Sequence, residues 1–278
     1  MSEGQHTKDL ENQLPHHKAS ASAGGKCLNR HISYKPCDGQ NNSCSHRWQS
    51  YLRMEEDKGL YNYPAYQSLI GRRNIPTAAY EKDGVKIPDW YSFTLNSPTM
   101  GSWDIGVHQP GQKAKNFWGP CYIPYWHEAH HIVPNSTLRE AINSAAKGLT
   151  FQSAVIKEMR RGLLDAGYNL NFKVNMIMLP IDAEVSDSIQ LPRHRHTARH
   201  RNHVSYNNYI KDQLEPILSA MAKDIKDHNV PNYSVSKQRI DNISKKVYKE
   251  ITNAIRGGKR GRSLDEYSDK KAKRRRGS

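Results

Sequence analysis

The chain has 278 residues, enough for one or two domains whose cores need no disulfide staples. Its formal net charge of +15 predicts a polyanionic partner. The longest apolar run, VNMIMLPI, is far shorter than the roughly 20 residues of a membrane-spanning helix, and the polar N-terminus lacks the apolar core of a secretory signal. We therefore expect no membrane association, and a protein that stays in the cytoplasm of its producer unless a specialised secretion machine delivers it.

The N-terminal part divides into two stretches. Residues 1–25 are rich in Ser, Gly, His and Gln, which predicts disorder. Residues 26–120 hold many Tyr, Trp, Pro and Gly residues, which predicts an irregular folded region with one helix in HRWQSYLRMEED. This region also contains candidate ligands of a structural zinc, although they lack a CxxC pair. Reduced, partly buried thiols are the competing interpretation. These candidates are Cys27, Cys37, Cys44 and His46.

Residues 121–222 carry clearer signals and are predicted to form one domain. Ser136 or Thr137 is expected to cap a helix that ends at Gly148, with Glu140 completing a capping box. A second helix, FQSAVIKEMRRGLLDAG, ends at Gly167. Its expected apolar face consists of Phe151, Val155, Met159 and Leu163.

The rest of the chain is predicted to be one strand, two helices and a tail. VNMIMLP indicates a strand, and the helices lie in VSYNNYIKDQLEPILSAMAKDI and SKQRIDNISKKVYKEITNAIRGG, the latter in a C-terminal helical region, 223–256. Residues 257–278 contain nine basic and three acidic residues without an apolar pattern, which predicts a disordered basic tail. Such a tail would add phosphate contacts, and its two basic clusters also match a nuclear import signal.

The adjacent histidines His130 and His131 suggest chemistry. A metal-dependent phosphodiesterase needs a ligand for a divalent ion and a base for the attacking water. Neighbouring residues of an extended segment point to opposite faces, so one histidine can hold a metal while the other faces the water.

A second histidine cluster lies just before a predicted helix, at His194, His196, His200 and His203. The spacings 196/200 and 200/203 each place two imidazoles on one helical face, where they could hold one ion. Arginines alternate with these histidines and would contact phosphates. They are Arg193, Arg195, Arg199 and Arg201.

The motifs AHHIVP, LLDAGYNLN, NMIMLP and a histidine cluster followed by YNNYI occur in this order between Tyr125 and Leu218. Together they resemble the AHH nucleases of the HNH/endonuclease VII superfamily, which occur as toxin domains in bacterial polymorphic toxins and effectors. The resemblance implies an α+β fold in which a ββα-metal (HNH/His-Me finger) core is embedded in a mainly helical domain. It also implies one divalent cation, with Mg, Mn, Zn and Ni all left open.

Carried over by motif, the resemblance implies that His130 is a metal ligand, His131 the general base and Asn175 the asparagine that orients the base and its loop. His200 and His203 would be the distal ligands. The family usually spaces these as H-x-G-x-H, so His196 stays open as the partner of His200 in place of His203.

We therefore expect a metal-dependent endonuclease, with DNA favoured over RNA, that acts as a toxin or effector and has a cognate immunity protein. The alternatives are a non-catalytic nucleic-acid-binding protein and a zinc-stabilised adaptor. Neither alternative explains the histidine doublet together with its downstream cluster.

Overall fold

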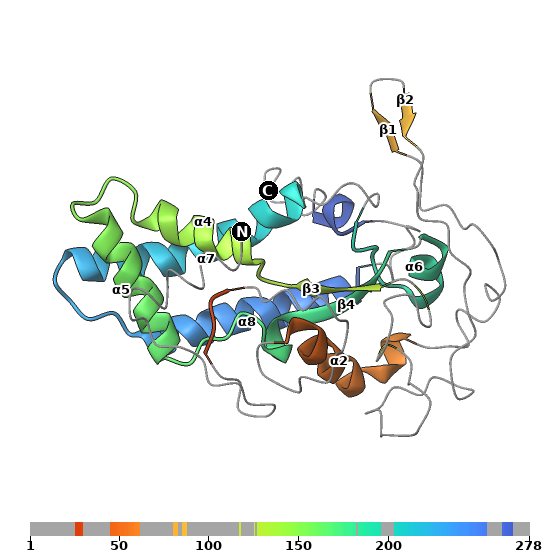
Figure 1. Ribbon diagram of the computed structural model, residues 1–278, viewed down its shortest axis with the longest axis horizontal. Helices are drawn as coiled ribbons and strands as arrows, with labels where there is room; N and C mark the ends of the chain where they lie inside the picture. Colours follow the sequence, from red (N-terminus) through yellow and green to blue (C-terminus); the bar gives the residue numbers. More distant parts are fainter. Residues whose placement is uncertain are drawn as a thin grey trace.

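The structure, a computed structural model, describes residues 26–29, 45–61, 80–82, 85–87, 117, 125, 127–181, 183–195, 203–254 and 263–268. Helices predominate, with two small sheets (Figure 1). The helices are α2 (His46–Glu56), α4 (Asn135–Ala145), α5 (Gln152–Asp165), α6 (Ala183–Ile189), α7 (Val204–Lys226) and α8 (Tyr233–Thr252), with short 3₁₀ helices at Lys58–Tyr61 and Lys173–Asn175. The strands are β1 (Tyr80–Lys82), β2 (Val85–Ile87), β3 (His127–His131) and β4 (Met176–Pro180).

Both sheets are antiparallel pairs. In one of them β1 pairs with β2, and in the other β3 pairs with β4, so that His130 stands opposite Ile177 and His131 opposite Met176. The predicted strand VNMIMLP is confirmed as β4, and its partner β3 carries the histidine doublet. Mixed helices and small sheets agree with the expected α+β class.

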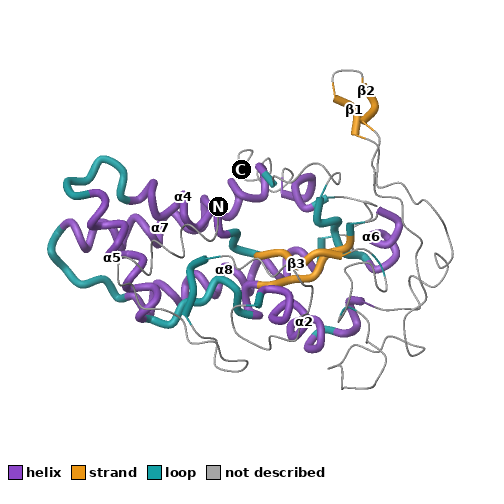
Figure 2. Tube along the Cα trace, viewed as in Figure 1, coloured by secondary structure: helices purple, strands orange, loops and turns teal. Residues whose placement is uncertain are grey.

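Strand β4 is buried on both faces, which explains its continuous apolar sequence. Because side chains alternate along a strand, Ile177 and Leu179 join a large core with α4, α5, α7 and α8, whereas Met178 joins a smaller core with α2 and α6. Figure 2 shows α2 beside the strands, with α4, α5 and α7 extending to one side of them. The β3–β4 pair is therefore held between two separate cores.

Helix α4 begins earlier than predicted. The expected cap by Ser136 or Thr137 is wrong, because the helix starts at Asn135 with Pro134 as its N-cap and without a side-chain cap. Proline suits the start of a helix because its φ is already fixed near the helical value and it has no N–H to satisfy. The side-chain amide of Asn135 instead donates a hydrogen bond to the carbonyl of Leu28 at 2.9 Å, which connects the start of the helix to residues 26–29.

Helix α5 follows the prediction except at its first residue. Val155, Met159 and Leu163 are buried as expected, but Phe151 precedes the helix in a left-handed conformation, with φ of 60°, and is 80% exposed. The chain must reverse direction between α4 and α5, and this turn carries Phe151 away from the core. At the other end, Gly167 has a φ of +76° and the Tyr168 amide donates to Leu163, the C-terminal closure that the sequence predicted.

Residues 263–268 correct the predicted disorder of the basic tail. They form a helical turn in which Leu264 is fully buried in the main core. The carboxylate of Asp265 also accepts from the Tyr206 amide at 3.0 Å, at the start of α7. The sequence SLDEYS is too short and polar to fold alone, and it docks on an existing surface through Leu264. Among the described helices, none combines the length and apolarity needed to cross a bilayer.

Candidate metal centre and active site

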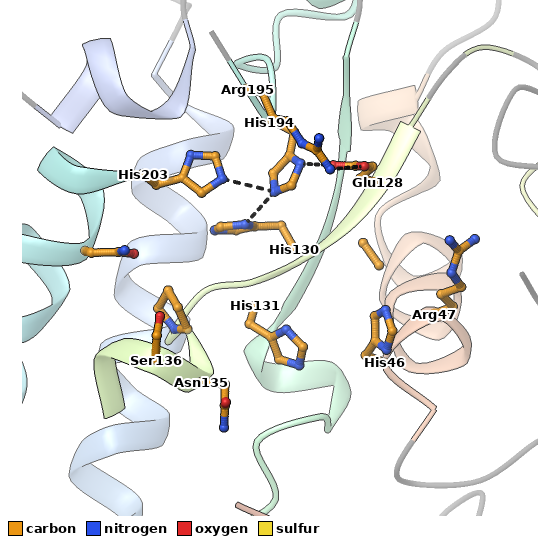
Figure 3. Close-up of a pocket in the computed structure, with 13 residues that line it drawn as sticks. His46, Arg47, Glu128, His130, His131, Asn135, Ser136, His194, Arg195 and His203 are labelled. Atoms are coloured by element: carbon orange, nitrogen blue, oxygen red, sulfur yellow. Dashed lines mark hydrogen bonds and ion pairs between the residues drawn. The ribbon is translucent and has the colours of Figure 1, made fainter. Parts of the chain in front are cut away.

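One cavity of about 400 Å³ adjoins the histidine doublet (Figure 3). Its walls come from the first turn of α2, the end of β3, the start of α4, the segment before α7 and the first turn of α7. The described residues that line it are His46, Arg47, Glu128, Ala129, His130, His131, Pro134, Asn135, Ser136, His194, Arg195, His203 and Asn207. Five of these thirteen residues are histidines, which is a composition suited to holding a cation.

Three imidazoles converge at one side of the cavity. His130 Nδ1 lies 2.9 Å from His194 Nε2, and His203 Nε2 lies 3.3 Å from the same atom. His130 is at the end of β3, His194 is in the segment after α6, and His203 is the N-cap residue of α7. Each offers one nitrogen within 4.8 Å of the other two, which makes them a candidate metal-binding group among the described residues.

Glu128 orients His194. Its Oε2 accepts a hydrogen bond from His194 Nδ1, and its Oε1 forms an ion pair with Arg195. Burial alone would raise the pKa of the Glu128 carboxyl, but the adjacent His194 and Arg195 outweigh it and lower that pKa to about 2. In the neutral form of His194, an Nδ1–H directed at the carboxylate leaves the lone pair on Nε2, which faces His130 and His203.

These residues fit a divalent cation. Imidazole nitrogens that share an ion at about 2.0–2.1 Å lie roughly 3 Å apart, as His194 Nε2 does from both of its neighbours. A carboxylate behind a histidine is the usual support of a metal-bound imidazole. All three donors are imidazoles, a set that suits zinc, nickel and other transition metals better than magnesium.

His131 points away from this trio. Its Nε2 lies 2.8 Å from Asn171 Oδ1, while the Asn171 amide nitrogen donates to the Asn29 carbonyl at 2.8 Å. This second bond fixes Oδ1 as the acceptor, so His131 Nε2 must carry the proton. In the neutral ring Nδ1 is then the basic nitrogen.

Asn175 holds the loop that follows His131. Its Oδ1 accepts from the Val133 amide at 2.7 Å and from the Ser244 hydroxyl at 2.8 Å. Its amide nitrogen donates to the carbonyls of Leu170 and Val133. The side chain therefore joins the loop after β3 to α8 and to the segment before β4. The side chain that accepts from His131 is that of Asn171, not Asn175.

The N-terminal helix α2 also reaches the cavity. His46 lies beside His131, with 5.6 Å between their ring centroids, and Arg47 follows it in the lining. His46 was a candidate zinc ligand in the sequence. Of the proposed cysteine ligands, Cys27 is buried with its thiol 3.3 Å from the Asn29 carbonyl oxygen, and Cys37 and Cys44 lie outside the described residues.

The other candidates fall in three places. Arg195 lines the cavity, whereas Arg193 is buried with its guanidinium 4.0 Å from Glu266. The remaining candidates of the cluster lie outside the described residues; they are His196, Arg199, His200 and Arg201. Glu128, Asn171 and His194 line or support the site, but none of them has a role predicted from the sequence. Their available signals were a carboxylate two residues before the doublet, an asparagine in the LLDAGYNLN motif and membership of the histidine cluster.

Comparison with known protein families agrees with this geometry. Residues 117–251 match a nuclease family of the HNH/endonuclease VII superfamily that is defined by a conserved Ala-His-His. The matched segment contains the doublet, Asn175, His194 and His203, and ends within α8. No curated protein and no solved structure gave a significant match.

Proposed function

Because its residues 117–251 belong to the AHH nuclease family of the HNH/endonuclease VII superfamily, we propose that this protein is a metal-dependent endonuclease that cleaves duplex DNA. The observation that carries the proposal is the convergence of His130, His194 and His203 in a cavity that His131 also lines. The net charge of +15 favours a nucleic-acid substrate of either kind.

The proposed ββα-metal core consists of β3, β4 and the first turn of α7. In support, β3 and β4 pair in register with His130 at the end of β3. His203 caps α7, and the Tyr206 hydroxyl of that helix donates to the Ile132 carbonyl at 2.6 Å, directly after the doublet. Helices α4 and α5 stand between the two strands in sequence, so this core would be an interrupted hairpin.

In the proposed reaction His131 takes a proton from the attacking water through Nδ1. The hydrogen bond to Asn171 selects the tautomer that can accept it, and Asn175 fixes the loop on which the ring sits. A positioned base of this kind contributes about 10²–10⁴ in rate. A bound divalent cation would stabilise negative charge on the phosphoryl and leaving oxygens. His130, His194 and His203 would hold it, with Glu128 fixing the orientation of His194.

Nicking of supercoiled plasmid tests the proposal. Wild-type protein should nick the plasmid, EDTA should stop the reaction, and a divalent metal added in excess should restore it. His131→Ala should bind metal but not cut. A protein that binds DNA without cutting it under any metal would instead be a non-catalytic binding protein, and selective cleavage of RNA would change the substrate.

Substitution of single histidines tests the ligand set. His194→Ala and His203→Ala should each lower metal affinity and activity by orders of magnitude, because two remaining ligands hold an ion weakly. His228→Asn is the control, because His228 is an exposed histidine just after α7. It should change neither metal affinity nor activity. Loss of metal binding in His200→Ala with retention in His194→Ala would return the ligand role to His200.

We also propose that the nuclease acts as a toxin or effector, with a specialised secretion system and an inhibitory immunity protein. The support is the resemblance of its motifs to toxin nuclease domains. Expression in a bacterial cytoplasm should arrest growth and degrade DNA, and His131→Ala should abolish both effects. Growth that is equally slowed by the inert variant would contradict a nuclease toxin.

A further inference from the structure

We propose that helix α2, which lies outside the segment matching the nuclease family, completes the active site, and that Arg47 binds a backbone phosphate of the substrate. This inference rests on the proposed nuclease function. It adds a substrate-binding residue from a part of the chain that the family match does not include.

Helix α2 is fixed against the strands that carry the site. Trp48, Tyr51 and Met54 are buried in one core with Met178 of β4. On another face, the Gln49 side chain accepts from the Lys173 amide at 3.0 Å, just before β4. The position of the helix relative to β3 is therefore set by packing and by hydrogen bonding, which is what a precise binding residue requires.

The C-terminal half of α2 is held as well. The Arg53 guanidinium lies 3.9 Å from the centre of the Tyr248 ring of α8, and the Tyr248 hydroxyl donates to Asp57 at 2.5 Å. The first turn, with His46 and Arg47, is the part that reaches the cavity. Figure 3 shows the two residues on the wall opposite His203 and Ser136.

The lining has an excess of positive charge that calls for an anion. Glu128 is the sole carboxylate among the described lining residues, and it is already bonded to His194 and Arg195. Arg47 and Arg195 together outweigh it before any metal is bound. The positive formal charge of the described lining favours a negatively charged ligand such as the phosphodiester backbone.

Arginine is suited to this task. Its planar guanidinium can donate two parallel hydrogen bonds to one phosphate, and it keeps its charge at all relevant pH values. Such a contact sets the position of a strand without reading its bases. Arg47 lies next in sequence to His46, whose ring is beside the proposed base His131. A phosphate held by Arg47 would thus lie close to the bond under attack.

Equilibrium binding of a short fluorescent duplex DNA tests the role of Arg47. The measurement uses full-length protein with the inert His131→Ala background and a range of salt concentrations. Adding Arg47→Gln should weaken binding about tenfold, as expected for a charged hydrogen-bonded contact. It should also lower the slope of log affinity against log salt by about 0.9. Arg47→Lys should retain most of the slope and part of the affinity.

Lys58→Gln is the matched control, because Lys58 is an exposed cation in the same N-terminal segment that does not line the cavity. It should leave affinity and salt slope near those of the background. Calorimetric metal affinity should be equal in Arg47→Gln and its parent, which separates a lost phosphate contact from a damaged cavity. In the active background, Arg47→Gln should raise KM far more than it lowers kcat.

The outcomes distinguish this inference from the proposed function. If wild-type protein cuts DNA and Arg47→Gln matches Lys58→Gln in affinity, slope and KM, the inference is wrong and the nuclease assignment stands. If Arg47→Gln loses metal affinity or fails to fold while Arg47→Lys also loses the salt slope, Arg47 is structural. If wild-type protein never cuts, the proposed function fails although the binding series still reports on Arg47.

Discussion

Glu128→Gln is the sharpest test of the metal centre, because it alters no proposed ligand. The substitution keeps the shape of the side chain but removes its charge. His194 Nδ1 then faces an amide that can offer either an oxygen or an NH₂ group, so its tautomer is no longer imposed. Arg195 loses its carboxylate partner in the same step.

The expected loss follows from the arrangement of the three histidines. Glu128 orients one of them, His194, and that ring supplies the nitrogen shared by both short distances in the cluster. Removing a carboxylate that supports a metal-bound histidine typically lowers metal affinity about 10–100-fold. This corresponds to about 1.4–2.7 kcal/mol of binding free energy. His194→Ala should cost more, since it removes the ligand itself.

Isothermal titration calorimetry with zinc or manganese measures the effect, with plasmid nicking at saturating metal as a second assay. Glu158→Gln is the control, because Glu158 pairs with Arg161 on the exposed side of α5. We expect Glu128→Gln to regain most of its activity when metal is raised. If its metal affinity equals that of wild-type protein while His194→Ala binds poorly, the carboxylate does not orient the ligand.

The remaining predictions concern the proposed base, the packing of α5 against Tyr233, and the change of folding stability at acidic pH. Asn171→Ala should lower kcat about 10²-fold or more without changing metal affinity, because His131 loses its imposed tautomer; unchanged kcat would remove Asn171 from the mechanism. Gly162→Ala places a Cβ 2.1 Å from the Tyr233 ring, so urea denaturation should show a loss of about 1–3 kcal/mol, less when Tyr233 is also shortened. Burial lowers the pKa of His127 to about 4 from 6.5, so the unfolded chain binds a proton that the folded chain does not. In metal-free protein the free energy of unfolding should therefore fall by up to about 1.4 kcal/mol per pH unit between pH 6.5 and 4, and His127→Gln should flatten this slope.

Much of the secondary structure could be predicted because each element carries its own local pattern. Val155, Met159 and Leu163 recur at helical spacing, and β4 is an apolar run of strand length. The exceptions are at the ends of elements. Phe151 is a large apolar residue of the kind found in cores, but its exposed position in the turn between α4 and α5 is set by how those helices pack. Local sequence does not contain that information.

The same limit explains the 263–268 turn. Leu264 is a single apolar residue among charged neighbours, so no pattern predicts that it is buried. Its burial depends on a surface formed by distant residues. The hydrogen bond from the Tyr206 amide, at the start of α7, to Asp265 spans 59 positions in sequence. Segments of this kind fold on a core that already exists. They cannot be predicted from their own composition.

The spacing of the histidines was not enough to predict which of them joins His130 in the candidate metal centre. The spacings 196/200 and 200/203 indicate a shared ion only if those residues are helical, and the described part of α7 begins at Val204. His194 and His203 lie nine positions apart in sequence, and their Nε2 atoms are 3.3 Å apart. His203 is the N-cap residue of α7, whereas His194 lies in the described segment after α6. Glu128, two positions before the doublet, is a signal that could have singled out His194, because the imidazole of a metal ligand commonly donates its second N–H to a carboxylate. The pairing of β3 with β4 and the Pro180 carbonyl, which accepts from the His194 amide at 2.8 Å, then place that imidazole at the end of the strand pair. The position of His194 therefore depends on how β3 and β4 pair. That pairing is held by the two cores on either side of the strands, and most residues of those cores lie outside the Ala-His-His motif.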